Sequence, residues 1–416
     1  MSVYKGKSLT IELFGASHAE AVGVKMLGYP AQQEVDITQL RAFLDRRKPG
    51  SGDITSARRE PDEPIFLSGI ESGVTNGSEI ISVIKNKDVR REDYVNHIPR
   101  PGHADLTAWI KYGIEHDMSG GGEFSGRMTA PLCVAGGICL QYLARHGISV
   151  SAKVITIGGK DDDFEGTIRS AKADGDSVGG IIECVISGVP AGIGGELFDG
   201  LESRISQLIF AIPAVKGIEF GAGFKASKMR GSQHNDAFIL SDGVIVTESN
   251  NHGGILGGIT SGMPVVFRTA IKPTPSIAKP QRSVDMDTMQ PAEIAVSGRH
   301  DPCIVPRAVP VIEAAAAIAF ADLLISDEKT LEIKDIRSRI DRIDRELTFL
   351  FTERMELCEK IGEYKKAHSL PTCDPVRESE KLASVRELAG EKYADEIEEL
   401  YRHIFGISRE YQERIK

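Results

Sequence analysis

The pattern of hydrophobic and polar positions divides the chain into two regions. Up to about residue 328, short apolar, β-branched runs alternate with helical patterns, and Gly and Pro separate them. The pattern predicts strands at 80–84, 150–157, 180–186 and 264–270, and helices at 105–117 and 132–146. This mixture is typical of an α+β domain, which we place at residues 1–328.

The second region, residues 329–416, has a helical pattern throughout. Its apolar residues follow the alternating three- and four-residue spacing of a coiled-coil seam, at positions 333, 336, 340, 343, 347, 350, 357, 361 and 364. Arg354 occupies the seam position between 350 and 357, where a lone cation is costly unless an anion meets it. Asp374-Pro375 predicts the start of a second helix, and a third begins near Ala394. Three helices in so short a region leave apolar surface uncovered, so we expect pairing with a second copy.

Composition supports the same division and excludes several classes of function. Only three of the 43 glycines and two of the 19 prolines follow residue 328. The net charge of −10 argues against non-specific nucleic-acid binding, so any anionic substrate must be held by local cationic clusters. The six cysteines have no metal-binding spacing and predict reduced thiols, and we expect no metal. Without an apolar leader or a bilayer-length apolar run, we expect a cytoplasmic protein that does not contact membranes.

Nucleotide-binding signatures give no match. The sequence contains no GxGxxG between a strand and a helix and no GxxxxGK[ST], which argues against Rossmann and P-loop sites. The many glycine-rich turns would suit a phosphate-bearing cofactor bound in loops through free backbone N–H groups.

The densest chemistry lies in residues 297–313, which read SGRHDPCIVPRAVPVIE. Arg299, His300, Asp301 and Arg307 crowd two guanidiniums, an imidazole and a carboxylate into nine residues. Such crowding favours anion binding or proton transfer. The alternative is a surface turn that starts a helix.

Other motifs repeat this combination of cations, imidazoles and glycines. Residues 14–18 read FGASH and carry His18, and residues 45–62 read DRRKPGSGDITSARREPD. The basic run in the second motif suits a clamp on phosphate or carboxylate, or else is a solvated loop. Further motifs are PRPGHAD at 99–105, SGGGEFSGRMTA at 119–130, NNHGGILGGITSGM at 250–263 and KPTPSI at 272–277.

Taken in order, these motifs resemble those of chorismate synthase across residues 1–328. The resemblance implies a β-α-β sandwich that eliminates phosphate from 5-enolpyruvylshikimate 3-phosphate to give chorismate. It also implies reduced FMN as cofactor, NADPH as a candidate reductant of that flavin, and a homotetramer. The rival interpretation is some other FMN protein.

The resemblance also assigns roles within this sequence. His18 would protonate the departing phosphate, His103 would stabilise or protonate the reduced flavin, and Asp301 would help the flavin N5 act as base. Arg47 and Arg299 would bind anionic groups of substrate or cofactor, and Arg127 is a further substrate-binding candidate. The expected FMN contacts are Arg47, Glu123, Phe124, Ser125, Gly257, Lys272, Pro273, Thr274, Pro275, Ser276 and Arg299. The sequence departs from the family pattern at Ala16, Asp53 and Glu123, and each departure removes a polar or positive contact.

Residues 331–416 resemble the all-helical chorismate mutase, a three-helix fold of the helix-swapped dimer type that converts chorismate to prephenate without a cofactor. The motif is carried by Arg337, Arg354, Lys365, Asp374, Arg377, Glu378, Ser408 and Gln412. The three arginines would bind the substrate carboxylates, with Arg337 supplied by the partner chain. Lys365 and Gln412 would contact the ether oxygen, and Glu378 the hydroxyl.

The alternative for this tail is a non-catalytic module, either a dimerising coiled coil or a binder of an aromatic effector. The main interpretation is a bifunctional enzyme whose second domain consumes the product of the first.

Overall fold

The computed structural model describes residues 2–48, 60–88, 97–241, 243–296 and 301–415, without the side chains of 331, 332, 334 and 335. It separates into two compact units, Met1–Glu328 and Lys329–Lys416. Each unit is described by itself below.

Among its described residues, the first unit contains one five-stranded sheet, one four-stranded sheet and four pairs of strands, all antiparallel. One sheet has the strand order β1 (Ser2–Lys5), β2 (Thr10–Gly15), β3 (Ala21–Leu27), β7 (Ile80–Lys85) and β4 (Ile65–Ser68). The other has the order β10 (Val215–Phe220), β15 (Val265–Ile271), β9 (Gly180–Ser187) and β8 (Ser149–Ile157). The pairs are β5 (Ile70–Glu71) with β6 (Val74–Thr75), β11 (Phe238–Ser241) with β12 (Val244–Thr247), β13 (Ile255–Leu256) with β14 (Ile259–Thr260), and β16 (Gln281–Asp285) with β17 (Gln290–Ile294).

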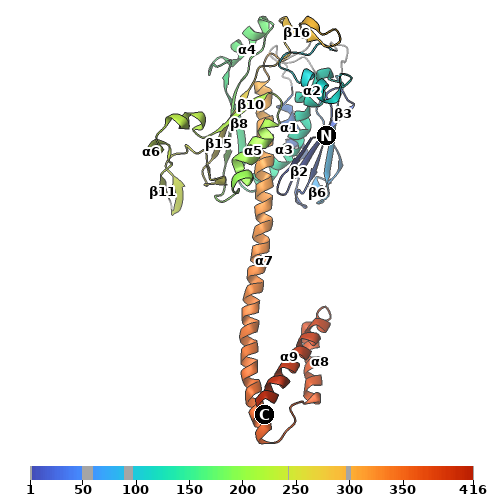
Figure 1. Cartoon of the computed structure of the whole chain (residues 1–416), viewed down its shortest axis with the longest axis vertical. Helices are drawn as coiled ribbons and strands as arrows, with labels where there is room; N and C mark the ends of the chain where they lie inside the picture. Colours follow the sequence, from blue (N-terminus) through green and yellow to red (C-terminus); the bar gives the residue numbers. More distant parts are fainter. Residues whose placement is uncertain (1, 49–59, 89–96, 242, 297–300, 416) are drawn as a thin grey trace. The chain divides into compact units, whose positions relative to one another are not determined.

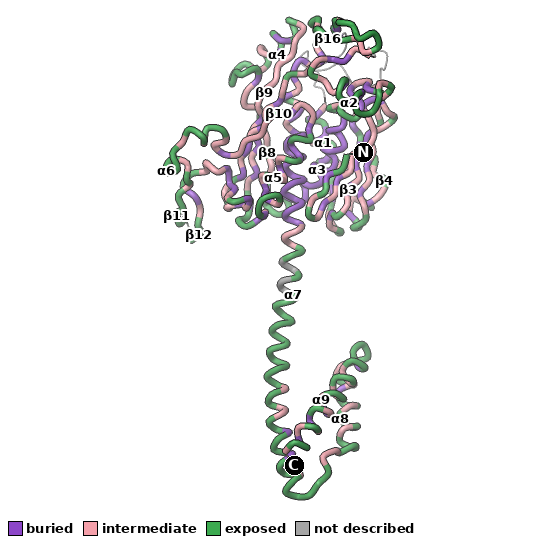
Figure 2. Tube along the Cα trace, in the orientation of Figure 1, coloured by how far each residue is buried: buried purple, intermediate pink, exposed green. Residues whose placement is uncertain are grey.

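Helices fill the space between the two sheets (Figure 1). The α-helices of this unit are α1 (Ile37–Asp45), α2 (Asp105–Tyr112), α3 (Thr129–Arg145), α4 (Phe164–Ala173), α5 (Leu201–Phe210), α6 (Gly231–His234) and the first part of α7 (Val305–Ala367). Helix α3 contacts β2, β3 and β7 of one sheet and β8 of the other. Helix α3 and the start of α7 are surrounded by other elements and are buried (Figure 2). Their sequences are therefore apolar on nearly every face of the helix. The predicted β-α-β sandwich is confirmed.

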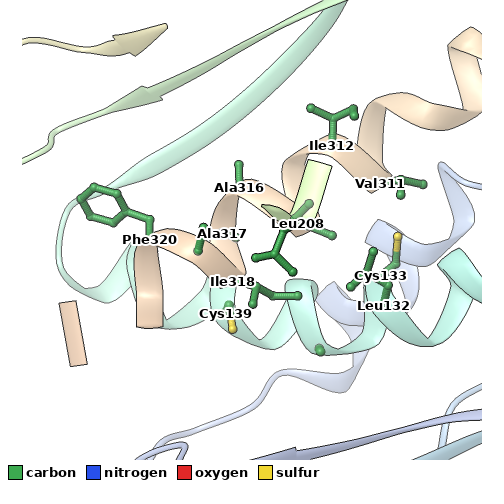
Figure 3. Packing of buried hydrophobic residues seen from close by; sticks show 14 of the residues in the cluster. Leu132, Cys133, Cys139, Leu208, Val311, Ile312, Ala316, Ala317, Ile318 and Phe320 are labelled. Atoms are coloured by element: carbon green, nitrogen blue, oxygen red, sulfur yellow. The ribbon is translucent and has the colours of Figure 1, made fainter. Parts of the chain in front are cut away.

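Small residues set the spacing of α3 and α7 inside this layer (Figure 3). A Cβ atom added to Gly136 on α3 would lie 2.2 Å from the Cβ of Ala314 on α7. Since real Cβ atoms do not approach so closely, the two helices can pack at this distance only while residue 136 is glycine.

We therefore expect Gly136→Ala to lower the free energy of unfolding of the first unit by about 1–3 kcal/mol, because the added methyl group forces the helices apart. Thermal or urea unfolding measures this change. Gly231→Ala is the control, since a Cβ there meets no atom within 4 Å. Equal stability of the two variants would contradict the packing argument.

The predicted strands all appear within one or two residues of their expected bounds. The helix expected at 105–117 is shorter and ends at Tyr112, because Gly113 adopts φ +97° and breaks it. Residues 305–330 are apolar and long enough to cross a membrane by composition, but 94% of that window is buried within the protein. Its hydrophobicity is that of a core helix.

The second unit consists of the remainder of α7, α8 (Pro375–Ala389) and α9 (Ala394–Ile415). The predicted start of α8 is confirmed, since the Asp374 side chain accepts a hydrogen bond from the Arg377 backbone N–H and Pro375 opens the helix. The apolar seam of α7 is exposed in the single chain: Ile336, Ile340, Leu347 and Leu350 are each about half accessible to solvent.

Candidate functional site

A cavity of about 920 Å³ in the first unit gathers most of the predicted site residues. This volume is at the upper end of the range for small-molecule and cofactor sites. The predicted residues that line it are Arg47, His103, Glu123, Phe124, Ser125, Arg127, Lys272, Thr274, Pro275, Ser276 and Asp301. Six Arg or Lys side chains and three Asp or Glu side chains line the cavity, although the whole protein is acidic. The site therefore favours anionic ligands.

His103 stands on the turn before α2 and is held by a buried carboxylate. Its Nδ1 lies 2.7 Å from Asp105 Oδ1, which favours the tautomer that carries the proton on Nδ1 and leaves Nε2 for a ligand. Asp105 also accepts hydrogen bonds from the backbone N–H, Nε and Nη2 of Arg100. Burial alone would raise the pKa of Asp105, but the hydrogen bonds and charges of Arg100 and His103 outweigh it and hold that pKa well below its usual range. Asp105 thus stays ionised and fixes the imidazole.

A second buried carboxylate, Asp62, binds two guanidiniums at once. Arg47 donates to one of its oxygens and Arg127 to the other, and all three side chains are almost completely buried. Arg47 Nε and Arg127 Nη2 are also buried and find no hydrogen-bond acceptor among the described residues; the Glu60 carboxylate is 3.9 Å from the latter. Buried donors left without acceptors are costly, so an anionic ligand is expected to meet them.

This arrangement predicts a pH-dependent loss of stability. Burial raises the pKa of Asp62, but the positive charges of Arg47 and Arg127 lower it by more than burial raises it, so the net shift of this pKa is downward. Because the folded pKa lies below the unfolded value of about 3.9, the stabilisation is present above pH 4 and is lost as pH falls through the folded pKa.

We expect Asp62→Asn to lose about 3–5 kcal/mol of unfolding free energy at pH 7, since two buried guanidiniums lose their counter-charge. The difference in unfolding free energy between this variant and wild type should become smaller below pH 4. Urea unfolding at several pH values measures this difference. The control is Asp176→Asn, a partly exposed carboxylate that pairs with Lys279 and accepts from the Ser177 backbone N–H, so its substitution should cost no more than about 1 kcal/mol. A gap for Asp62→Asn that is constant with pH would contradict the argument.

Asp301 and Arg307 form a third pair, at the start of α7. The Arg307 guanidinium donates from Nη1 to Asp301 and from Nε to the backbone carbonyl of Arg47, at 3.0 Å in the latter case. This contact places the Asp301 carboxylate on the same wall of the cavity as the Asp62 cluster. Arg299, predicted beside them, and Asp53 lie outside the described residues.

Three glycines carry the chain around the predicted imidazoles. Gly120, Gly121 and Gly122 all have positive φ, which brings their backbone close to both rings. A Cβ on Gly120 would lie 2.1 Å from His18 Cε1, and one on Gly121 would lie 3.2 Å from His103 Nε2. The buried His18 therefore packs directly behind a wall of the cavity, although it does not itself line it.

Some predicted residues lie elsewhere. Gly257 belongs to the turn between β13 and β14 and does not line the cavity, nor does Pro273. In the basic run, Arg46 instead pairs with Glu313, in two hydrogen bonds of 2.7 and 2.9 Å. Lys272 donates to the carbonyl of Gly102, and burial, followed by the charge of Lys216, lowers its pKa.

Four partners of the predicted residues were not predicted from the sequence: Glu60, Asp62, Arg100 and Asp105. Two of them could have been suspected. Arg100 and Asp105 flank His103 in PRPGHAD, at a spacing that lets a turn bring them together. No local pattern relates Asp62 to Arg127, 65 residues away.

In the second unit, α7 and α9 bring several predicted residues together. Arg354 Nη1 donates to Ser408 Oγ at 2.5 Å, and its guanidinium lies 6.0 Å from the ring centre of Phe405. Gln412 is buried one turn beyond Ser408, and its Oε1 has no hydrogen-bond partner among the described residues. Arg354 thus lies in the apolar seam of α7 beside a polar side chain of α9.

The loop before α8 and its first turn hold the remaining residues. Lys365 Nζ donates to the Thr372 carbonyl at 2.6 Å, and Glu378 accepts two hydrogen bonds from Arg409. Arg337 and Arg377 are exposed. In the single chain, no contact links these two arginines to the Arg354 cluster among the interactions described.

Comparison with known proteins gives a family match for each of the two regions of the chain. Residues 9–325 match the chorismate synthase family model, and residues 336–413 match that of chorismate mutase type II. The chorismate synthase of Korarchaeum cryptofilum is 42% identical over 345 residues, covering 76% of this chain and 96% of that protein. The chorismate synthase of Thermococcus kodakarensis is 44% identical over 345 residues, covering 77% and 97%. A crystal structure of a chorismate synthase aligns with a TM-score of 0.62 at 27% identity, covering 78% of this chain and 93% of that one.

These family matches identify a lyase in the first unit, joined to an isomerase. The chain belongs to the chorismate synthase family and carries a chorismate mutase type II domain at its C-terminal end. The predicted fusion is confirmed.

Proposed function

We propose that the first unit eliminates phosphate from 5-enolpyruvylshikimate 3-phosphate to give chorismate, and that the second rearranges chorismate to prephenate. The observation that carries the first part is the pair of buried guanidiniums with unused donors beside the Asp105-bound imidazole of His103. A phosphate or carboxylate supplies the acceptors that these donors lack.

The cavity residues fit reduced FMN as cofactor. The cavity volume of about 920 Å³ lies within the range for cofactor sites, and Gly120 contributes to its wall. Glu123, Phe124, Ser125, Lys272 and residues 274–276 would hold the flavin, with Arg299 from outside the described residues. When bound, reduced FMN lends electron density to the allylic substrate and takes it back, which lets phosphate leave without net oxidation.

The side chains of this unit would provide binding and proton transfer. Arg47 and Arg127 would orient the substrate anion and stabilise charge on the departing phosphate. His18 would donate a proton to that phosphate as general acid. His103, held by Asp105, would keep its Nε2 directed at the ligand, and Asp301 would serve as the nearby carboxylate for proton transfer.

In the second unit, charge complementarity would select and stabilise a compact conformer of chorismate. Arg354, Arg377 and a partner-supplied Arg337 would bind the two carboxylates, while Lys365 and Gln412 would meet the ether oxygen, which gains charge as its C–O bond breaks. Glu378 would accept a hydrogen bond from the substrate hydroxyl, and Asp374 and Ser408 would complete the site. Since an ether oxygen can only accept, Gln412 would meet it through its amide N–H, while its buried Oε1, without a partner among the described residues, is left for a donor of the ligand.

We also propose a homo-oligomer in which the mutase units pair through the exposed α7 seam. Half-exposed residues such as Ile340 and Leu347 on a two-turn repeat favour a helical partner. The family resemblance supports a tetramer, a cytoplasmic location and NADPH as reductant of the flavin.

Anaerobic incubation of the full chain with reduced FMN and 5-enolpyruvylshikimate 3-phosphate tests both parts. We expect one phosphate released per chorismate formed, followed by prephenate. Phosphate release without prephenate would contradict the mutase assignment, and no phosphate release while added chorismate still becomes prephenate would contradict the synthase assignment.

A further inference from the structure

We infer that Arg409, a residue of α9 outside the set predicted from the sequence, is a positioning residue that neutralises and orients Glu378 for an anionic substrate. The inference rests on the proposed role of Glu378 as acceptor of the substrate hydroxyl. Arg409 neither touches the reacting atoms nor belongs to the motif of eight residues given above. Its proposed effect is on the affinity for the substrate.

The geometry singles out one ion pair. Arg409 Nη1 lies 2.8 Å from Glu378 Oε2 and 3.1 Å from Glu378 Oε1, so a single N–H group bridges both carboxylate oxygens. Cys373 Sγ lies 3.8 Å from the same nitrogen and 3.9 Å from Glu378 Oε1. The three side chains form one cluster that joins the loop before α8 to α9.

Position along α9 connects this cluster to the site. Arg409 directly follows Ser408, which binds Arg354, and precedes the buried Gln412 by three residues. Residues three apart lie on neighbouring positions of a helix face, so Arg409 borders the ligand-facing side of α9. A change at Arg409 therefore acts next to the substrate.

Charge explains why such a residue is needed. A carboxylate is the strongest acceptor that Glu378 can offer to the substrate hydroxyl, yet the substrate brings two carboxylates of its own. An uncompensated carboxylate in the same site would repel that dianion, and a guanidinium bound to it removes the repulsion. The bridging contact also limits Glu378 to one orientation, which the hydroxyl contact requires.

A double-mutant cycle in the full chain tests the inference, with mutase kcat and KM for chorismate as readouts. We expect Arg409→Gln to raise KM about three- to tenfold, the size suited to a partly exposed ion pair. Arg409→Lys, which keeps the charge, should recover most of the lost affinity. In a Glu378→Gln background the same Arg409→Gln change should leave KM unaltered, because no carboxylate remains to repel the substrate.

The control is Arg402→Gln, which removes an exposed arginine of the same helix that pairs with Glu398. It should behave as wild type, and circular dichroism should show unchanged helix content in all variants. An equal rise of KM from Arg409→Gln in both backgrounds would overturn the inference and assign Arg409 a packing role. Unchanged kinetics of Glu378→Gln alone would instead overturn the proposed role of Glu378, and the inference with it.

Discussion

Arg354→Ala is expected to lower mutase kcat/KM about 10³-fold while phosphate release by the first unit stays at its wild-type rate. Removing one preorganised donor to developing charge costs about 10²–10³ in rate, and Arg354 carries a full charge as well. It is the cation placed in the apolar seam, 2.5 Å from Ser408 Oγ, and its alanine variant leaves the buried Ser408 hydroxyl without its charged partner.

Chorismate consumption and phosphate release, measured on the same protein sample, test this prediction. Arg345→Ala is the matched control, since Arg345 lies on the exposed face of α7 and donates only to a carbonyl of its own helix. Retention of mutase activity within tenfold of wild type in Arg354→Ala would contradict its proposed contact with a substrate carboxylate. A parallel loss of both activities would indicate misfolding.

His103→Ala is expected to produce the opposite result, a fall of about 10²–10⁴-fold in phosphate release with mutase activity unchanged. The imidazole lies at the cavity with its Nδ1 fixed by Asp105, so its Nε2 is the atom left for the ligand. Losing it removes a positioned proton donor or acceptor, whereas the second unit shares none of its residues.

His146→Ala serves as control for this variant, because His146 pairs with Glu328 2.9 Å away and does not line the cavity. Phosphate release is followed anaerobically with reduced FMN in excess. A rate within threefold of wild type would contradict a role for His103 in the elimination.

Local sequence patterns predicted the parts of this protein whose structure depends on nearby residues. The strands, the cap of α8 and the seam position of Arg354 follow from spacing alone. The approach of Gly120 to His18 and of Gly121 to His103 is a tertiary contact that spacing does not predict. The contacts of Asp62 with Arg127, 65 positions away, and of Arg307 with the carbonyl of Arg47, 260 positions away, could not be predicted in this way. No periodicity records a contact across so long a stretch of chain.

The same distinction explains why the basic run at 46–48 was only partly predicted. Residues 46–48 all carry a positive charge within one turn, so their sequence does not show which of them contacts a ligand. In the structure, Arg46 pairs with the buried Glu313 of α7, and Arg47 pairs with Asp62. Tertiary partners thus decide which cation faces the cavity.

The Asp62 cluster also bears on the order in which the chain acquires its structure. Its contacts join residues separated by 15, 65 and 260 positions, through Arg47–Asp62, Arg127–Asp62 and Arg307–Arg47. Closing loops of that length costs entropy before any contact forms, so the anion-binding wall belongs to the late stages of folding. The helical unit depends on closer pairs, such as Arg354 with Ser408, 54 positions apart, and Arg409 with Glu378, 31 positions apart. We therefore expect a refolding chain to form its helical unit before the wall of this cavity.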